Sequence, residues 1–282
     1  MTLGPRASLL VAAALFSTGS AVVKAVELSP WQVASFRSAV AAVVLPLLLP
    51  SARGLRRPGV WAVGAAFAGM MILYVLANRH TTAAAAVFLQ GTAPLYVLLL
   101  SPLLLKECVR PADVLYLLAM GTGFALILLG GDRPSATAPD IATGNRLGAA
   151  AGFAWAVTLL GLRWLARDER RGTAEAAVTA GSVLAFLAAL PFALPVEGVR
   201  AVDAGGVLYL GGFQIAVAYV LLTRGMKRVP VLEASLLLLI EPVLGPAWAF
   251  LLHGERPGPV TLAGCAVMLA ATALHAVAKE RR

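Results

Sequence analysis

The chain has 282 residues, of which 60% are hydrophobic and only 13% are charged, and its mean hydropathy is +0.84. This composition excludes a water-soluble globular protein, in which about a quarter of the residues are charged. The net charge is +9, but the basic residues lie in short connectors between apolar runs, so they indicate orientation in a membrane and not binding of nucleic acid.

Apolar runs of about 20 residues, the length that crosses a bilayer, follow one another along the whole chain. The first run follows an early arginine and resembles a signal peptide, but it continues past a plausible cleavage site, so we interpret it as a retained helix. The fold class that follows is an all-α membrane protein with ten transmembrane helices. They are expected at residues 7–26, 30–50, 60–79, 82–105, 112–130, 146–166, 174–195, 205–226, 230–253 and 258–278.

The longest connector, residues 131–145, is rich in Gly, Pro, Ser, Thr and Asp, as flexible loops are. It lies almost at mid-chain and separates five expected helices from five. We therefore expect two units, residues 1–130 and residues 146–278, followed by a basic cytoplasmic tail at residues 279–282.

The two units repeat one another at a fixed spacing. A shift of 148 residues aligns Pro94 with Pro242, Glu107 with Glu255 and Pro111 with Pro259. It also aligns Gly64 with Gly212, Arg79 with Lys227 and Ala86 with Ala234. Two prolines and a glutamate at the same spacings in both copies indicate a duplicated five-helix unit.

A unit with five spans begins and ends on opposite sides of the membrane, so the second copy is inverted. The connector charges give the same answer independently. With the N-terminus inside, 16 Lys and Arg residues fall on the inner side and 6 on the outer side. The positive-inside rule then predicts cytoplasmic N- and C-termini in a multi-pass protein of the inner (plasma) membrane.

Inverted repeats indicate transport, because two halves that exchange shapes turn an outward cavity into an inward one. The substrate site is then expected between the halves, near the bilayer midplane. Pro94 and Pro242 lie at matching places in the fourth and ninth spans, where each removes a backbone donor and permits a bend. We expect these prolines to shape or gate the cavity; the alternative is that they are tolerated packing kinks.

Several segments carry a family resemblance that covers nearly the whole chain. They are residues 15–24 (LFSTGSAVVK), Ser29-Pro30 with Arg37, residues 78–84 (NRHTTAA) leading to Pro94 and Lys106-Glu107, Trp155, Glu241-Pro242-Val243 and Gly254-Glu255. With them the chain resembles the EamA-type transporters of the drug/metabolite transporter superfamily. One departure is Phe16-Ser17, where many relatives have Trp-Gly.

The resemblance implies a secondary, ATP-independent carrier of small metabolites, with export of aromatic or other neutral amino acids as the commonest activity. Nucleosides, sugars and cationic drugs are the alternative substrates, and a passive channel is a further alternative. Saturable counterflow separates a carrier from a channel.

Two charges inside spans are the first candidate site residues. Glu241 is placed near the middle of the ninth span, where a lone charge is costly unless it faces protein or water. It is suited to binding an ammonium group, to relaying a proton, or to holding a broken helix by accepting hydrogen bonds. Arg37 is suited to binding a substrate carboxylate or to pairing with Glu241.

Polar and aromatic side chains inside spans complete the expected substrate site. Gln90 and Gln214 are suited to orienting a zwitterion, or simply to bonding across helices. A ring with one polar edge is useful where an apolar side chain binds beside a polar head, although plain packing is the alternative for each. The rings in question are Tyr74, Tyr96, Tyr219, Trp155 and Trp248.

Charges near the span ends are expected to act as anchors or to pair between loops. These are Lys24, Glu107, Glu233 and Glu255, and Asn78 and His80 are expected at the interface. No known enzyme motif occurs, and the three histidines all lie near span ends, so we expect no catalysis, no metal and no cofactor. The expected partners are a small-molecule substrate and the lipid bilayer, and one chain of ten helices suffices to enclose a cavity.

Overall fold

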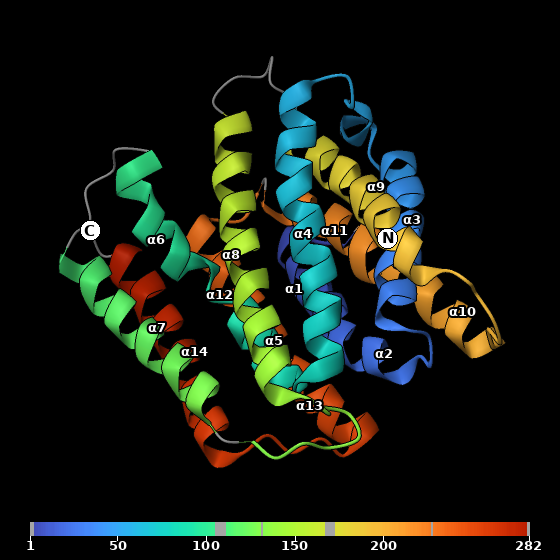
Figure 1. Cartoon of the computed structure of the whole chain (residues 1–282). Coiled ribbons are helices and arrows are strands. Elements are labelled where there is room, and N and C mark those ends of the chain that lie inside the picture. Colours follow the sequence, from blue (N-terminus) through green and yellow to red (C-terminus); the bar gives the residue numbers. More distant parts are fainter. Residues whose placement is uncertain (1–2, 105–110, 131, 167–172, 227, 281–282) are drawn as a thin grey trace.

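The computed structural model describes residues 3–104, 111–130, 132–166, 173–226 and 228–280, and these ranges contain helices and no β-strand (Figure 1). The predicted all-α membrane fold is confirmed. Nine helical stretches of the described chain have the length and hydropathy to span a membrane, and Asp113–Leu129 is a shorter apolar stretch at the place of the fifth span.

The first unit contains five spans, of which two are interrupted. Its elements are α1 (Pro5–Ser17), α2 (Gly19–Ala25), α3 (Pro30–Leu48), the short 3-10 helix η1 (Pro50–Arg53), α4 (Pro58–His80), α5 (Ala83–Gln90), α6 (Ala93–Leu104) and α7 (Pro111–Leu129). The chain sets these boundaries locally. Pro5, Pro30 and Pro58 occupy first-turn positions, where the missing N–H has no helical partner to lose.

The second unit also contains five spans, again with two irregular ones. Its elements are α8 (Ile141–Ala166), α9 (Ala174–Ala193), α10 (Ala201–Leu208), the π-helix η3 (Tyr209–Val217), α11 (Ala218–Met226), α12 (Val231–Leu238), α13 (Ile240–His253) and α14 (Pro259–Glu280). Gly254 ends α13 with a left-handed φ of 64°, a conformation that glycine adopts without a steric penalty.

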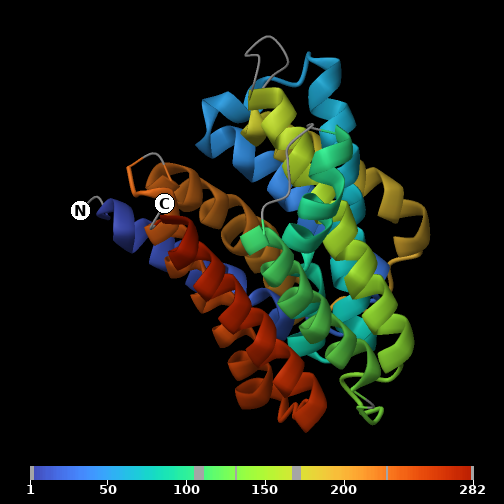
Figure 2. The same cartoon turned by 90° about the vertical axis from the view of Figure 1, so that its left-hand side faces the viewer.

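Helices of the two units pack against one another and not mainly within each unit. α4 packs along α8 and α9, α3 along α9 and η3, α1 along α11 and α13, and α7 along α14. Figure 1 shows α7 and α14 side by side at one edge of the bundle, with α4 and α8 at its centre. The two termini lie at similar heights in both views, as an even number of spans requires (Figure 2).

Glycines allow some of these helices to approach closely. A Cβ atom added to Gly64 of α4 would lie 2.8 Å from the backbone nitrogen of Gly181 in α9. The largest core cluster lies beside this crossing and includes Phe67, Met71 and Tyr74 of α4. The close crossing therefore fixes the helix that carries several side chains of the candidate site.

Candidate functional site

Three spans are interrupted near their middles. The first bends at Thr18 between α1 and α2, the fourth at residues 91–92 between α5 and α6, and the ninth at Leu239 between α12 and α13. At two of the breaks a threonine hydroxyl donates to the carbonyl three residues earlier: Thr18 to Leu15 at 2.7 Å and Thr92 to Leu89 at 2.5 Å. Each hydroxyl thus adds a second hydrogen bond to a carbonyl that also accepts the backbone N–H of the same threonine.

Pro94 and Pro242 lie directly after the breaks in the fourth and ninth spans. Pro94 is the second residue of α6, and Pro242 is the third residue of α13. A proline there cannot donate to the carbonyl four residues earlier, so the preceding helix ends. The 148-residue shift carries the break at Gly91 onto the break at Leu239. The two prolines therefore mark matching bends, as the sequence predicts, while a gating role stays a prediction.

Glu241 lies in the first turn of α13, one residue before Pro242. Its side chain is half-buried, and no described residue gives its carboxylate a hydrogen bond or an ion pair. Its electrostatic neighbours are the phenol groups of Tyr74 and Tyr219. The role of accepting hydrogen bonds at a broken helix therefore has no support in the described contacts, whereas binding of a cation needs such an unpaired carboxylate.

Tyr74 connects this carboxylate to the bend in the first span. Its hydroxyl lies 2.8 Å from the hydroxyl of Ser20, and both residues are buried. Thr18 makes a similar contact with Tyr209 of η3, at 2.9 Å between the hydroxyl oxygens. The polar run Ser17-Thr18-Gly19-Ser20 thus faces tyrosines from both units.

Aromatic rings form a continuous wall beside Tyr219. Its ring meets Phe16 edge-on with centroids 5.5 Å apart and Phe67 with centroids 6.1 Å apart. Phe67 in turn meets Trp155 of α8 at 6.3 Å. Edge-to-face pairs of this kind hold rings in fixed orientations. The wall joins spans one, three, six and eight.

Trp248 closes the site from α13. Its indole Nε1 donates to the hydroxyl of Ser17 at 3.1 Å. One turn earlier, a Cβ added to Gly245 would make ordinary van der Waals contacts, at 3.6 Å, with Ser17 and Val87. Phe16 and Ser17 therefore supply a ring to the aromatic wall and a hydroxyl that accepts the bond from Trp248.

Arg37 does not pair with Glu241 within the described chain. It is 1% exposed and donates to the backbone carbonyl of Met71 at 2.9 Å, while its guanidinium lies 5.9 Å from the centroid of the Tyr74 ring. Its Nε atom has no hydrogen-bond partner among the described residues. Arg37 therefore stabilises α4 through the carbonyl of Met71 and packs beside the ring of Tyr74.

The two amides belong to different units and make different contacts. Gln214 belongs to η3, is 7% exposed and packs on Gly19, where an added Cβ would lie 2.8 Å from its Nε2. Its Oε1 has no partner in the described chain. Gln90 ends α5 and contacts the sulfur of Met70 at 3.0 Å. π-helical segments are frequent at functional sites, which makes Gln214 the stronger candidate.

The structure places Tyr96 in the same cluster as Trp155, between α6 and α8. It packs against Phe153 with ring centroids 5.6 Å apart, within the cluster between α6 and α8. Asn78 lies two residues before the end of α4, is fully buried and donates to the carbonyl of Tyr74 at 2.9 Å; its depth at the membrane interface stays a prediction. Glu107 falls outside the described residues.

Sequence reasoning missed the bend at Thr18 and the residues Phe16, Ser17, Ser20 and Phe67. The available signal was a run of four small or polar residues in an otherwise apolar span. None of the substrate residues predicted from the sequence lines either of the two described cavities, which lie toward opposite ends of the bundle. The described residues contain no group of three His, Cys, Asp or Glu side chains that could hold a metal ion.

Comparison with known proteins identifies the architecture. The model of the EamA-like transporter family matches residues 7–129 and again residues 142–277. The chain belongs to the EamA-like transporter family. It is therefore a multi-pass membrane transporter of small molecules and not a member of an enzyme family.

A solved structure supports the same fold. A chain whose title reads "Crystal structure of protein" aligns with a TM-score of 0.64 and 23% identity, over 98% of both chains. Comparison with curated protein sequences gives no match. Discontinuous helices border the substrate site in transporters built from inverted repeats, which makes Glu241, Tyr74, Tyr219 and their neighbours the candidate site.

Proposed function

We propose that this EamA-like protein is a secondary carrier that exports amino acids, aromatic or otherwise neutral, across the inner (plasma) membrane. The single observation that carries the proposal is the carboxylate of Glu241, half-buried at a helix bend and unpaired within the described chain. A charge at this depth is expensive to keep and marks a site for a positive group. The ammonium of an amino acid is such a group.

The surroundings of Glu241 support an amphipathic substrate. Tyr74 and Tyr219 are electrostatic neighbours of the carboxylate, and aromatic rings attract an ammonium. Phe16, Phe67 and Trp155 extend the wall away from the charge. An apolar or aromatic side chain fits against this wall while the ammonium stays at Glu241.

The paired bends support alternating access and not an open channel. Each bend gives its span two rigid segments that meet near mid-membrane, at α5/α6 and at α12/α13. In inverted repeats such discontinuous helices border the substrate site and move as one repeat rocks against the other. One chain contains both bends, so we propose a functional monomer.

Amines without a carboxylate, such as cationic drugs, are the second candidate substrates. The observation that favours them is the position of Arg37, which is committed to a backbone carbonyl and to the ring of Tyr74 instead of to an open cavity. The site would then read the ammonium alone. Nucleosides and sugars lack the positive charge that Glu241 is suited to bind.

Counterflow in proteoliposomes tests the proposal. Vesicles are preloaded with one of a panel of unlabelled amino acids, amines, nucleosides or sugars, and entry of labelled phenylalanine or leucine is followed. We expect saturable entry that an internal amino acid accelerates, because a carrier returns faster when loaded. Absence of entry with every amino acid, from protein shown to be folded, would assign the site to another substrate class. Entry without saturation or acceleration would indicate a channel.

A further inference from the structure

A buried ion pair joins the two units at one end of the bundle. Lys24 at the end of α2 lies 3.0 Å from the carboxylate of Glu255, which follows α13, and the two side chains are only 2% and 3% exposed. Sequence reasoning assigned both residues to membrane boundaries and to loop pairing. Their almost complete burial sets them apart from ordinary boundary charges.

The pair is the centre of a larger set of bonds. The ammonium of Lys24 also donates to the carbonyls of Thr81 at 2.8 Å and Thr137 at 2.5 Å. Glu255 also accepts a hydrogen bond from the backbone N–H of Ala83, the first residue of α5. Four segments therefore converge on one pair of opposite charges.

Neighbouring bonds close the same end. His253 contacts the carbonyl of Ala21 at 2.8 Å, and the backbone N–H of Gly258 donates to Asp132 at 2.9 Å. These bonds join the end of α13 and the loop that follows it to the first unit and to the connector after that unit.

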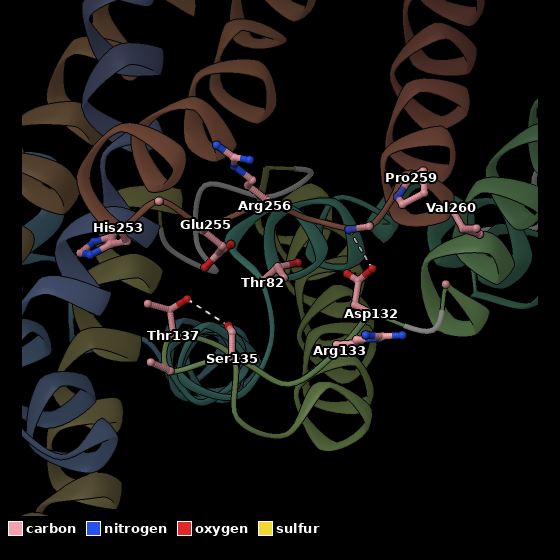
Figure 3. Close-up of a pocket in the computed structure, with 14 residues that line it drawn as sticks. Thr82, Asp132, Arg133, Ser135, Thr137, His253, Glu255, Arg256, Pro259 and Val260 are labelled. Carbon is pink, nitrogen blue, oxygen red and sulfur yellow. Dashed lines mark hydrogen bonds between the residues drawn. The ribbon is translucent and has the colours of Figure 1, made fainter.

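A cavity of about 570 Å³ lies directly beside the ion pair. Figure 3 shows its wall: one loop carries Asp132, Arg133, Ser135 and Thr137, and the other carries Glu255 and Arg256, directly after His253 at the end of α13. Glu255 lines the cavity while its carboxylate is bound to Lys24. The ion pair therefore lies at the wall of this cavity, on the side that Glu255 lines.

The opposite end has no comparable closure in the described chain. There Arg6 of α1 pairs with Glu233 of α12, but these side chains are 73% and 34% exposed. Water screens the attraction between two exposed charges, so this ion pair holds α1 and α12 together only weakly. Among the described residues, the ion pairs at the two ends thus differ in how deeply they are buried.

We propose that Lys24 and Glu255 form a latch that closes one access route to the substrate site, and that the pair separates in each transport cycle. Buried ions suit this task. Their desolvation nearly offsets their attraction, and both regain water when the end opens, so the closed and open states stay close in free energy. The predicted orientation makes this the outer gate. The inference rests on the proposed carrier function only for its transport consequences.

Accessibility of a buried reporter tests the latch without any substrate. Ala21→Cys is introduced into a Cys108→Ser, Cys265→Ala background, because Ala21 is 1% exposed and lies beneath the loop that carries Glu255. In purified, folded protein we expect Glu255→Gln to speed labelling by a hydrophilic maleimide at least fivefold. Arg6→Gln is the matched control, since it removes the ion pair at the other end, and it should leave the rate unchanged. Equal labelling rates with and without Glu255→Gln would overturn the proposal.

A double variant keeps the test decisive if single variants fold poorly. In Lys24→Met, Glu255→Leu an apolar pair of similar volume replaces the charges, so neither charge is left buried without its partner. Such a pair gains nothing from hydration, so that end should stay closed. We expect labelling at Ala21→Cys to slow at least fivefold and counterflow at least tenfold, with the substrate-induced rise in melting temperature retained. Wild-type rates of both would contradict the latch. If the wild-type protein shows no counterflow, the proposed substrate fails, while the labelling result still decides the latch.

Discussion

The bends in the fourth and ninth spans have the same geometry and different chemistry. The shift of 148 residues superimposes Gly91 on Leu239 and Pro94 on Pro242, and both helices break at these places. At the first bend, Thr92 donates to a carbonyl and is followed by the fully buried Ala93. At the second, Ile240 replaces that threonine, and the unpaired carboxylate of Glu241 stands where the first bend has Ala93.

The two copies of the repeat therefore share the bend but not the charged residue beside it. A proline after a break fixes the bend in both copies, because it removes the same backbone donor. The charge occurs in one copy only. The bends therefore supply a symmetric frame for movement, and Glu241 supplies an asymmetric contact for a positively charged group.

Removal of the charge from the ninth span should have the largest effect. We expect Glu241→Gln to lower counterflow of phenylalanine about 30-fold or more, because loss of one partner of a desolvated charge pair costs roughly 2 kcal/mol or more. The melting temperature should change little, since no described residue bonds to this carboxylate.

Glu233→Gln is the matched control, because it removes a more exposed carboxylate from the same span. It should leave counterflow within twofold of wild type. A poorly folded Glu241→Gln protein with normal activity per folded molecule would instead make Glu241 structural.

The two glycines related by the same shift should differ in how they tolerate a methyl group. Gly64→Ala places a Cβ 2.8 Å from the backbone of Gly181, whereas the nearest atom to a Cβ at Gly212 is 3.9 Å away, on Val40. We expect Gly64→Ala to destabilise the protein by about 1–3 kcal/mol, the range for overpacking, and Gly212→Ala to be neutral. Thermal unfolding in detergent measures both, and equal effects would show that the α4–α9 crossing adapts.

Substitution of Pro94 and Pro242 tests whether the two matching bends move during transport. Pro94→Ala and Pro242→Ala each restore a donor and favour a straighter helix. We expect each to slow counterflow several-fold while leaving the melting temperature equal or higher. If one variant slows transport and the other does not, only one bend moves in the cycle. Unchanged transport in both would reduce the prolines to packing kinks.

The smallest effect is expected at the exposed end of the bundle. Arg6→Gln removes an ion pair whose arginine side chain is 73% exposed, and such pairs contribute about 0–1 kcal/mol. Unfolding and counterflow should therefore stay near wild-type values. A large loss of stability would mean that this end is held as firmly as the end that carries Lys24 and Glu255.

Much of the fold could be predicted from the sequence, because bilayer length and repeated prolines are local signals. The ten spans, the inverted duplication and the bends beside Pro94 and Pro242 all follow from apolar runs and from one alignment shift. The bend at Thr18 and the π-helix at Tyr209–Val217 carry no such local mark, since neither contains a proline.

The candidate site was less predictable, because it depends on which faces of distant helices meet. Span depth alone could not show that Arg37 binds the carbonyl of Met71, or that Tyr96 packs between α6 and α8. Lys24 and Glu255 looked like boundary charges because 231 residues separate them in sequence. Only the packed helices bring them to 3.0 Å.

The most direct test of the central claim compares ligands that differ only in their charged groups. Phenylalanine, phenethylamine and 3-phenylpropionate compete with labelled phenylalanine in counterflow by wild-type and Glu241→Gln protein. If Glu241 binds the ammonium, phenylalanine and phenethylamine compete with labelled phenylalanine for the wild-type protein, and 3-phenylpropionate does not. In Glu241→Gln, the remaining transport should no longer show this preference for amines. Equal competition by all three compounds in the wild type, or the same preference in Glu241→Gln, would contradict the account.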